Sequence, residues 1–112
     1  NTRHMVNESV LNAMKKTAFL INVARGGVVD EPALISALAA QKIAGAALDV
    51  FEEEPLPKTS PLWNLDNVIL TPHISGNNIR YHEKAAALFA ENMQRYIEKR
   101  PLLNKVDRKR GY

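Results

Sequence analysis

Three polar residues, Arg25, Asp49 and His73, stand where three short apolar runs of the sequence end. A guanidinium offers a planar fork of donors to a carboxylate, and an imidazole gives and takes a proton near neutral pH. If the apolar runs are parallel strands, their carboxyl ends meet at one edge of a sheet, where open α/β sheets bind ligands. The pattern therefore predicts a small-ligand site, with Arg25 as its leading residue.

Each of these three residues also has an ordinary structural explanation. Arg25 is compatible with a surface arginine, Asp49 with the cap of a helix or turn, and His73 with a locally satisfied loop histidine. Their joint placement favours function, because three independent strand ends would converge on one crevice.

The first half of the sequence predicts a strand–helix–strand unit. Ala18–Val23 is typical of a strand buried on both faces of a parallel sheet, and 43–50 is a second apolar run. Asp30 is a favoured N-cap for a helix at 31–41, between the two strands. This helix would connect the two parallel strands in a right-handed crossover. The residues expected to face inward from this helix are Leu34, Leu38 and Ala39.

The segment before the first strand predicts a loop and a short helix. Residues 1–6 form the loop, and Asn7 is the N-cap of a helix that ends at Lys15 or Lys16, where cations are favoured. The residues expected on its inward face are Val10, Leu11 and Met14.

The second half predicts one more strand and a long helix. The proline-rich stretch 51–65 is expected to be a loop with one turn at Pro61–Asn64. Val68–Thr71 is the third strand, and Asn78 is expected to cap a helix to about Lys99. One stripe of that helix is apolar and holds Phe89, Met93, Tyr96 and Ile97. The elements together predict an α/β fold with a Rossmann-like parallel sheet and a long C-terminal helix.

Composition narrows the class of protein. A chain of 112 residues with 46% hydrophobic and 24% charged residues is typical of a single soluble globular domain. Cysteine is absent, which excludes disulfides, thiolate metal sites and cysteine nucleophiles. No apolar run approaches the ~20 residues that span a bilayer and no signal peptide is visible, so we expect a cytoplasmic protein without a membrane partner.

The net charge of +3 does not indicate a nucleic-acid partner. Residues 100–112 hold five basic residues, Arg110 among them, against one aspartate, which leaves a net charge of −1 on the rest of the chain. A basic tail without interleaved aromatic residues is typical of a solvated end, and no basic face extends into the body. We therefore expect no nucleic-acid binding.

Three stretches, in this order along the sequence, resemble motifs of the D-isomer-specific 2-hydroxyacid dehydrogenases. They are NVARGGVVDEPAL at 22–34, AALDVFEEEPLP at 46–57 and LTPHISG at 70–76, and the similarity covers nearly the whole chain. It falls in the second half of the family's nucleotide-binding domain. The resemblance implies NAD or NADP as cofactor, and hydride transfer between it and a small D-2-hydroxy acid or 2-oxo acid.

The resemblance also implies roles for four side chains. Arg25 would bind the substrate carboxylate and polarise the 2-oxo group, and His73 would be the catalytic acid/base. Asp49 would hold the nicotinamide carboxamide. Glu54 would orient the imidazole of His73 and favour its charged form; only its spacing from the other residues distinguishes it from the two glutamates before it.

Five further positions match the nicotinamide side of the family's cofactor cleft, largely through their backbones: Asn22, Val23, Ala24, Ser75 and Gly76. The remaining histidines, His4 and His82, match no catalytic position, and we interpret both as surface residues.

The sequence lacks the family's GxGxxG turn, which binds the cofactor pyrophosphate. We therefore expect residues 1–112 to be a partial NAD(P)-binding domain, the carboxyl-terminal piece of a longer, homo-oligomeric enzyme with a separate substrate domain. Alone, the chain is expected to be inactive and to self-associate through its unpaired strand edge and the apolar stripe of its long helix.

Two functions fit the resemblance. One is an oxidoreductase, with the glyoxylate/hydroxypyruvate reductase-like members most similar. The other is a non-enzymatic, corepressor-like regulatory protein of the same fold. The set Arg25, Glu54 and His73 does not separate them, since regulatory relatives can keep it; composition favours the enzyme.

Overall fold

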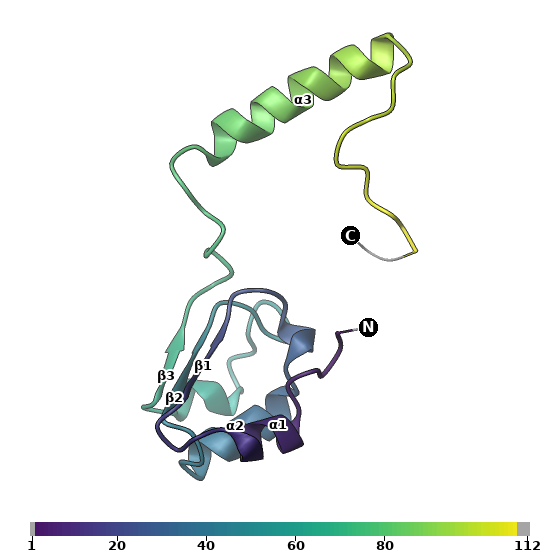
Figure 1. The fold of residues 1–112 in the computed structure, drawn as a ribbon. Coiled ribbons are helices and arrows are strands. Elements are labelled where there is room, and N and C mark those ends of the chain that lie inside the picture. Colours follow the sequence, from purple (N-terminus) through teal and green to yellow (C-terminus); the bar gives the residue numbers. More distant parts are fainter. Residues whose placement is uncertain (1, 110–112) are drawn as a thin grey trace. The chain divides into compact units, whose positions relative to one another are not determined.

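The computed structural model describes residues 2–109, which form two compact units (Figure 1). The N-terminal unit is Asn1–Gly76 and the C-terminal unit is Asn77–Tyr112. Asn1, part of the predicted first loop, and Arg110, part of the predicted basic tail, lie outside the described residues. Every predicted site residue belongs to the N-terminal unit.

The N-terminal unit contains the predicted parallel sheet. Its strands β1 (Phe19–Asn22), β2 (Gly45–Leu48) and β3 (Val68–Leu70) lie in the order β1-β2-β3, and both neighbouring pairs are parallel. In the register of the sheet, Ile21 lies opposite Ala47, which lies opposite Ile69. The α/β fold with a parallel sheet is confirmed, and each strand is shorter than predicted.

Two capped helices, α1 (Glu8–Ala13) and α2 (Glu31–Ala39), pack against each other beside the sheet (Figure 1). The predicted caps are confirmed: Asn7 accepts a hydrogen bond from the backbone N–H of Val10, and Asp30 accepts one from that of Ala33. Two short 3₁₀ helices complete this unit, η1 (Gly26–Val28) and η2 (Pro61–Asn64), the second where a turn was predicted.

The core lies between the helices and one face of the sheet. Its fully buried large side chains are Leu11, Leu34, Leu38, Ile43 and Leu62. Two of the residues predicted to face inward, Val10 and Ala39, are exposed. Val10 is exposed because α1 is too short to bury a second column of residues, and the helix ends before the lysine pair. In α2, Ala37 is buried in place of Ala39, which lies at the exposed end of the helix.

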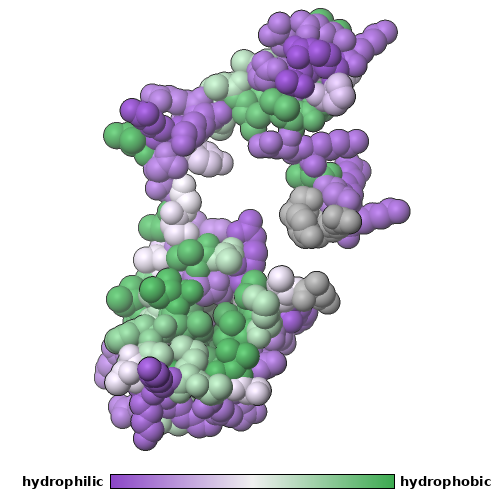
Figure 2. Space-filling model, in the orientation of Figure 1, coloured by the Kyte–Doolittle hydropathy of each residue, from purple (hydrophilic) through white to green (hydrophobic). Residues whose placement is uncertain are grey.

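The prediction that the first strand is buried on both faces was also wrong. Phe19, Ile21 and Ile69 are each about two-thirds exposed, whereas Leu20 and Leu70, one position along, pack against the core. Successive residues of a strand point to opposite faces of the sheet, and the helices cover only one of these faces. Figure 2 shows apolar side chains gathered on the surface of this unit.

The C-terminal unit is built on α3 (Tyr81–Ile97). This helix begins two residues later than predicted, because Asn78 accepts a hydrogen bond from the backbone N–H of Arg80 and so caps a preceding turn. The predicted apolar stripe, from Phe89 to Ile97, is exposed. Among residues 2–109, no helix is both long enough and apolar enough to cross a membrane.

Candidate active site

The turn after β1 is shaped by the side chain of Asn22, the buried last residue of that strand. Its Oδ1 accepts a hydrogen bond from the backbone N–H of Ala24 at 3.1 Å, and its Nδ2 donates to the carbonyl of Arg25 at 3.1 Å. An asparagine at a strand end commonly closes such a turn. Val23, Ala24 and Arg25 are exposed at the carboxyl edge of the sheet, where the sequence predicted them.

Gly26 brings this turn directly against the turn at Phe51–Glu54. A Cβ atom at Gly26 would lie 1.8 Å from the carbonyl oxygen of Phe51 and 2.5 Å from the backbone nitrogen of Glu52. Only glycine permits backbones to approach so closely. Arg25 and Glu54 are thereby carried by two turns in direct contact, although 29 positions separate them in the sequence.

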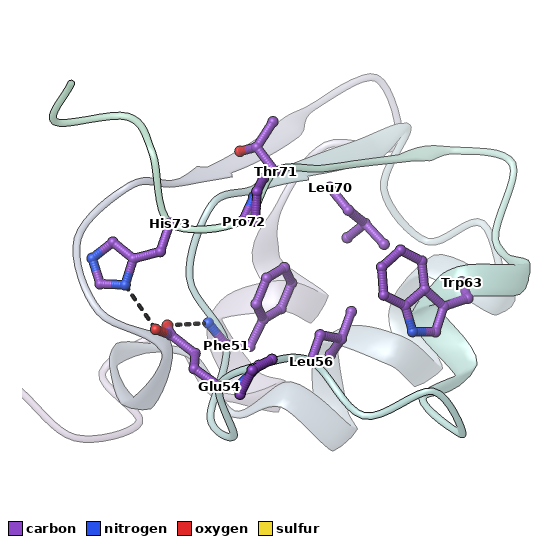
Figure 3. A pocket seen from close by; sticks show the side chains of 9 residues that line it. Phe51, Glu54, Leu56, Trp63, Leu70, Thr71, Pro72 and His73 are labelled. Atoms are coloured by element: carbon purple, nitrogen blue, oxygen red, sulfur yellow. Dashed lines mark hydrogen bonds and ion pairs between the residues drawn. The ribbon is translucent and has the colours of Figure 1, made fainter. Parts of the chain in front are cut away.

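Glu54 and His73 form a hydrogen-bonded pair (Figure 3). The Nδ1 of His73 lies 2.7 Å from one carboxylate oxygen of Glu54, and the other oxygen accepts the backbone N–H of Phe51 at 3.0 Å. The hydrogen bond from His73, that from Phe51 and the positive charges of His73 and Arg25 lower the pKa of Glu54, against a smaller opposing effect of desolvation. A carboxylate on Nδ1 favours the tautomer whose Nε2 is free to exchange a proton with a ligand.

The backbone at His73 helps to direct its ring. Its φ angle is +53°, in the left-handed region that few residues other than glycine adopt, and its N–H donates to the carbonyl of Thr71 at 3.1 Å. The chain therefore bends sharply at Pro72. Non-glycine residues in this region are enriched at functional sites.

Asp49 is 2% exposed and holds the segment that follows β3. Its carboxylate accepts hydrogen bonds from the hydroxyl of Thr71 at 2.5 Å and from the backbone N–H groups of Ile74 and Ser75 at 2.9 and 2.8 Å. Burial alone would raise the pKa of Asp49, but these hydrogen bonds, with one from the Ser75 side chain, lower it well below its usual range. Asp49 is thus an ionised anchor for the backbone next to His73.

The last two predicted positions, Ser75 and Gly76, lie exposed at the end of this anchored segment. A Cβ atom at Gly76 would meet no atom of the described chain within 4 Å. The structure therefore brings Asp49 together with Ser75, and Glu54 with His73. Arg25 is near enough to Glu54 for its positive charge to help lower the pKa of that carboxyl.

A cavity of about 560 Å³ lies beside the Glu54–His73 pair. Apart from that pair its lining is mainly apolar, formed by Phe51, Pro55, Leu56, Trp63, Leu70, Thr71 and Pro72 (Figure 3). Sequence reasoning missed the Phe51 backbone and Thr71. The sequence could have indicated Thr71, since it is the polar residue directly after the third apolar run. No sequence pattern indicates that the backbone N–H of Phe51 holds Glu54.

The two remaining histidines differ from each other. His82 is exposed, as predicted, with its ring edge-on to Tyr81. His4 also lies at the surface, with its side chain 34% exposed, but unlike His82 it has an acidic partner: its Nε2 lies 2.5 Å from the carboxylate of Glu52. No group of histidine and acidic side chains among residues 2–109 is arranged to hold a metal ion.

Parallel strands with a polar cluster at their carboxyl ends define part of an α/β nucleotide-binding domain. Residues 1–75 match the family model described as the NAD binding domain of the D-isomer specific 2-hydroxyacid dehydrogenases. Because this match covers more than half of the sequence, the chain belongs to that family.

Individual relatives are similar in sequence and in structure. The glyoxylate reductase of Thermofilum pendens is 55% identical over 92 residues, which are 82% of this chain and 27% of that protein. A D-isomer specific 2-hydroxyacid dehydrogenase from Xanthobacter autotrophicus, solved with NADPH and MES, matches with a TM-score of 0.85 and 50% identity over 99% of this chain and 45% of that one. An NADPH-dependent glyoxylate/hydroxypyruvate reductase from Sinorhizobium meliloti, solved with NADP and malonate, matches with a TM-score of 0.82 and 39% sequence identity. That match covers 94% of this chain and 33% of the reductase chain. The chain thus spans less than half the length of these relatives.

Proposed function

We propose that this chain supplies the acid/base half of the active site of a nicotinamide-dependent oxidoreductase that interconverts small D-2-hydroxy acids and 2-oxo acids. The observation that carries the proposal is the Glu54–His73 hydrogen bond of 2.7 Å at the carboxyl edge of the sheet, in a member of this family. Arg25, on the turn packed against that of Glu54, adds a cation for the substrate.

His73 is the proposed acid/base. With Nδ1 engaged by Glu54, the Nε2–H of the protonated ring gives its proton to the carbonyl oxygen when the 2-oxo acid is reduced, and takes it back in the reverse direction. The negative charge of Glu54 favours the protonated ring, which is the form needed for reduction.

Arg25 is the proposed substrate-binding residue. Its guanidinium is exposed and donates one hydrogen bond to the carbonyl of Ala24 at 2.7 Å. Its other N–H donors remain available for a carboxylate and the adjacent 2-oxo group. A polarised carbonyl accepts hydride more readily because charge develops on its oxygen.

The residues at the sheet edge fit one end of NAD or NADP, which supplies or accepts the hydride when bound. Val23, Ala24 and Gly76 are exposed there, and no atom of the described chain crowds Gly76. Asn22, Ser75 and Asp49 fix the backbones on either side. We propose that Asp49, besides anchoring residues 74 and 75, holds the nicotinamide carboxamide. No GxGxxG turn is present for the pyrophosphate, so the phosphate half of that site is proposed to lie elsewhere in the whole enzyme.

The same reasoning extends to the whole protein. We propose residues 1–112 as a partial cofactor-binding domain of a cytoplasmic homo-oligomer with its own substrate domain, in keeping with relatives of which this chain spans 27% to 45%. The exposed apolar residues Phe19, Ile21 and Ile69 support contact with further protein surface.

A chimera tests the proposal. In it, the chain replaces the matching segment of the Thermofilum pendens glyoxylate reductase, and reduction of glyoxylate and hydroxypyruvate is measured with NADH and NADPH. We expect turnover, and His73→Ala should lower kcat by roughly 10²–10⁴-fold. His82→Ala, the matched control, should leave kcat unchanged. Full activity of the His73 variant would disprove the acid/base role, and a folded chimera that binds cofactor without turnover would favour the regulatory function.

A further inference from the structure

His4 lies between two carboxylates that come from different turns. Its Nε2 is 2.5 Å from Glu52, and its Nδ1 is 4.0 Å from Asp30, the N-cap of α2. The Arg3 guanidinium also faces Glu52, at 3.8 Å. The φ angle of His4 is +49°, in the left-handed region that few residues other than glycine adopt. A half-buried imidazole with two acidic neighbours is not explained by its place in a solvated loop.

The backbone around His4 is fixed to the turn that follows Arg25. The N–H of His4 donates to the carbonyl of Gly27 at 2.9 Å, and that of Val6 donates to the carbonyl of Val28 at 3.1 Å. Asp30 completes the ladder by donating its N–H to the carbonyl of Val6 at 2.9 Å. Residues 4–6 are thereby hydrogen-bonded to residues 27–30, with one parallel bridge between Val6 and Val29.

Glu52, the partner of His4, belongs to the turn that carries Glu54. Its carboxylate is hydrogen-bonded to the Nε2 of His4, and its backbone N–H donates a hydrogen bond to the carboxylate of Glu31 at 3.0 Å. The preceding residue, Phe51, donates the N–H that holds Glu54. The residue that pairs with His4 and the residue whose N–H holds Glu54 are therefore neighbours in one turn.

We infer that His4 is a positioning residue for the Glu54–His73 pair: through Glu52 it fastens the turn at residues 51–54 to the turn at residues 25–30. The imidazole links a segment anchored beside Arg25 with a carboxylate two positions before Glu54. This inference rests on the proposed function, since it gives His4 a part in orienting the acid/base. Its physical content, the coupling of His4 to the ring of His73, holds independently of turnover.

The test uses the full 112-residue chain labelled with ¹⁵N only on its three histidines, with the ring signals assigned by substitution. His4→Asn keeps the tolerance of a left-handed backbone but is too short to reach Glu52. We expect the ring signals of His73 to move toward those of the exposed His82, whose ring has no carboxylate partner among the described residues. In a uniformly labelled sample, exchange of the Phe51 amide proton should accelerate by about tenfold, the effect of losing one charge-assisted hydrogen bond.

Two further variants sharpen the test. Glu52→Ala removes the same contact from the other side and should reproduce both changes, whereas Glu52→Gln keeps an acceptor for His4 and should restore most of the native signals. Glu53→Gln is the matched control, because Glu53 is exposed and makes no hydrogen bond or ion pair within residues 2–109. It should change neither readout.

Unchanged His73 signals in folded His4→Asn and Glu52→Ala variants would overturn the inference, as would an equal change in Glu53→Gln. If His4→Asn fails to fold, Glu52→Ala decides, and unfolding of both would overturn it by showing that the contact holds the fold instead of the pair. The outcome is separable from the proposed function. Loss of the acid/base role in the chimera would leave the coupling of His4 to His73 intact, and loss of that coupling would leave the role of His73 intact.

Discussion

The strand end that carries Asp49 and the turn that carries Glu54 lie five positions apart, yet their carboxylates hold different parts of the chain. Asp49 is buried and accepts hydrogen bonds from Thr71, Ile74 and Ser75, so it fixes the path of a backbone. Glu54 lies at the surface and accepts the imidazole of His73, so it fixes the direction of a ring. Both carboxyls have a lowered pKa. A lowered pKa at this edge therefore does not by itself distinguish an anchor from a member of an acid/base pair.

Removing the anchor should have the largest effect. In the chimera, Asp49→Ala should lower kcat/KM by at least about 10²-fold, because a shift of roughly 1 Å in a catalytic group costs that much and the whole segment with His73 loses its acceptor. Asp66→Ala, at an exposed aspartate, is the control and should be neutral. Steady-state kinetics with glyoxylate measure both, and parental activity of Asp49→Ala would contradict the anchoring role.

A side chain at Gly26 should force apart the two turns that carry Arg25 and Glu54. Gly26→Ala places a Cβ atom against the backbone of Phe51, and such overpacking costs about 1–3 kcal/mol of the free energy of unfolding. Gly76→Ala, where the added atom meets open space, should stay within about 0.5 kcal/mol. Urea unfolding of the two variants measures the difference; equal stabilities would mean that the close contact is dispensable.

Replacing Arg25 by lysine keeps the charge near Glu54 but loses the planar fork of donors. We expect KM for glyoxylate in the chimera to rise roughly tenfold, the worth of one hydrogen bond to a charged group. KM for the cofactor should not change. The exposed Arg80, replaced in the same way, is the control. A rise in KM of the same size in the Arg80→Lys variant would point to a general charge effect.

The smallest expected effect is the contribution of Glu54 to the pH dependence of the free energy of unfolding. The pKa of Glu54 is lowered from 4.5, chiefly by His73, so the ionised carboxylate stabilises the folded state above that pH, and this contribution is lost as the pH falls through the lowered value. Glu54→Gln should therefore be less stable than the parent at about pH 6, and the gap should close as the pH falls below 4.5. Solvent and salt weaken the effect at this exposed position. Unfolding free energies across that range measure the gap, and a gap independent of pH would contradict the assignment.

Much of the fold was predictable because it depends on periodic or local signals. Asn7 and Asp30 were recognisable as caps, and three apolar runs with polar ends indicated parallel strands. Burial of β1 on both faces was wrongly predicted, because exposure depends on which elements cover a sheet. The helix at Asn78 began late because asparagine caps a turn as readily as a helix.

The candidate site divides in the same way. Arg25, Asp49 and His73 are recognisable by their positions after the apolar runs, and the family spacing selects Glu54, which is hydrogen-bonded to His73 in the structure. The contacts of His4 and the donor at Phe51 were missed for one physical reason. They depend on backbone paths in turns, which leave no periodic pattern in the sequence.

Trp63 gives the molecule a natural optical probe. It is the only tryptophan of the sequence, it lines the cavity next to Glu54 and His73, and its indole N–H donates to the carbonyl of Pro57 at 2.9 Å. Indole emission responds to local polarity, so its wavelength reports directly on events at this cavity. Ligand occupancy and local opening are thus observable in the native chain without a chemical dye.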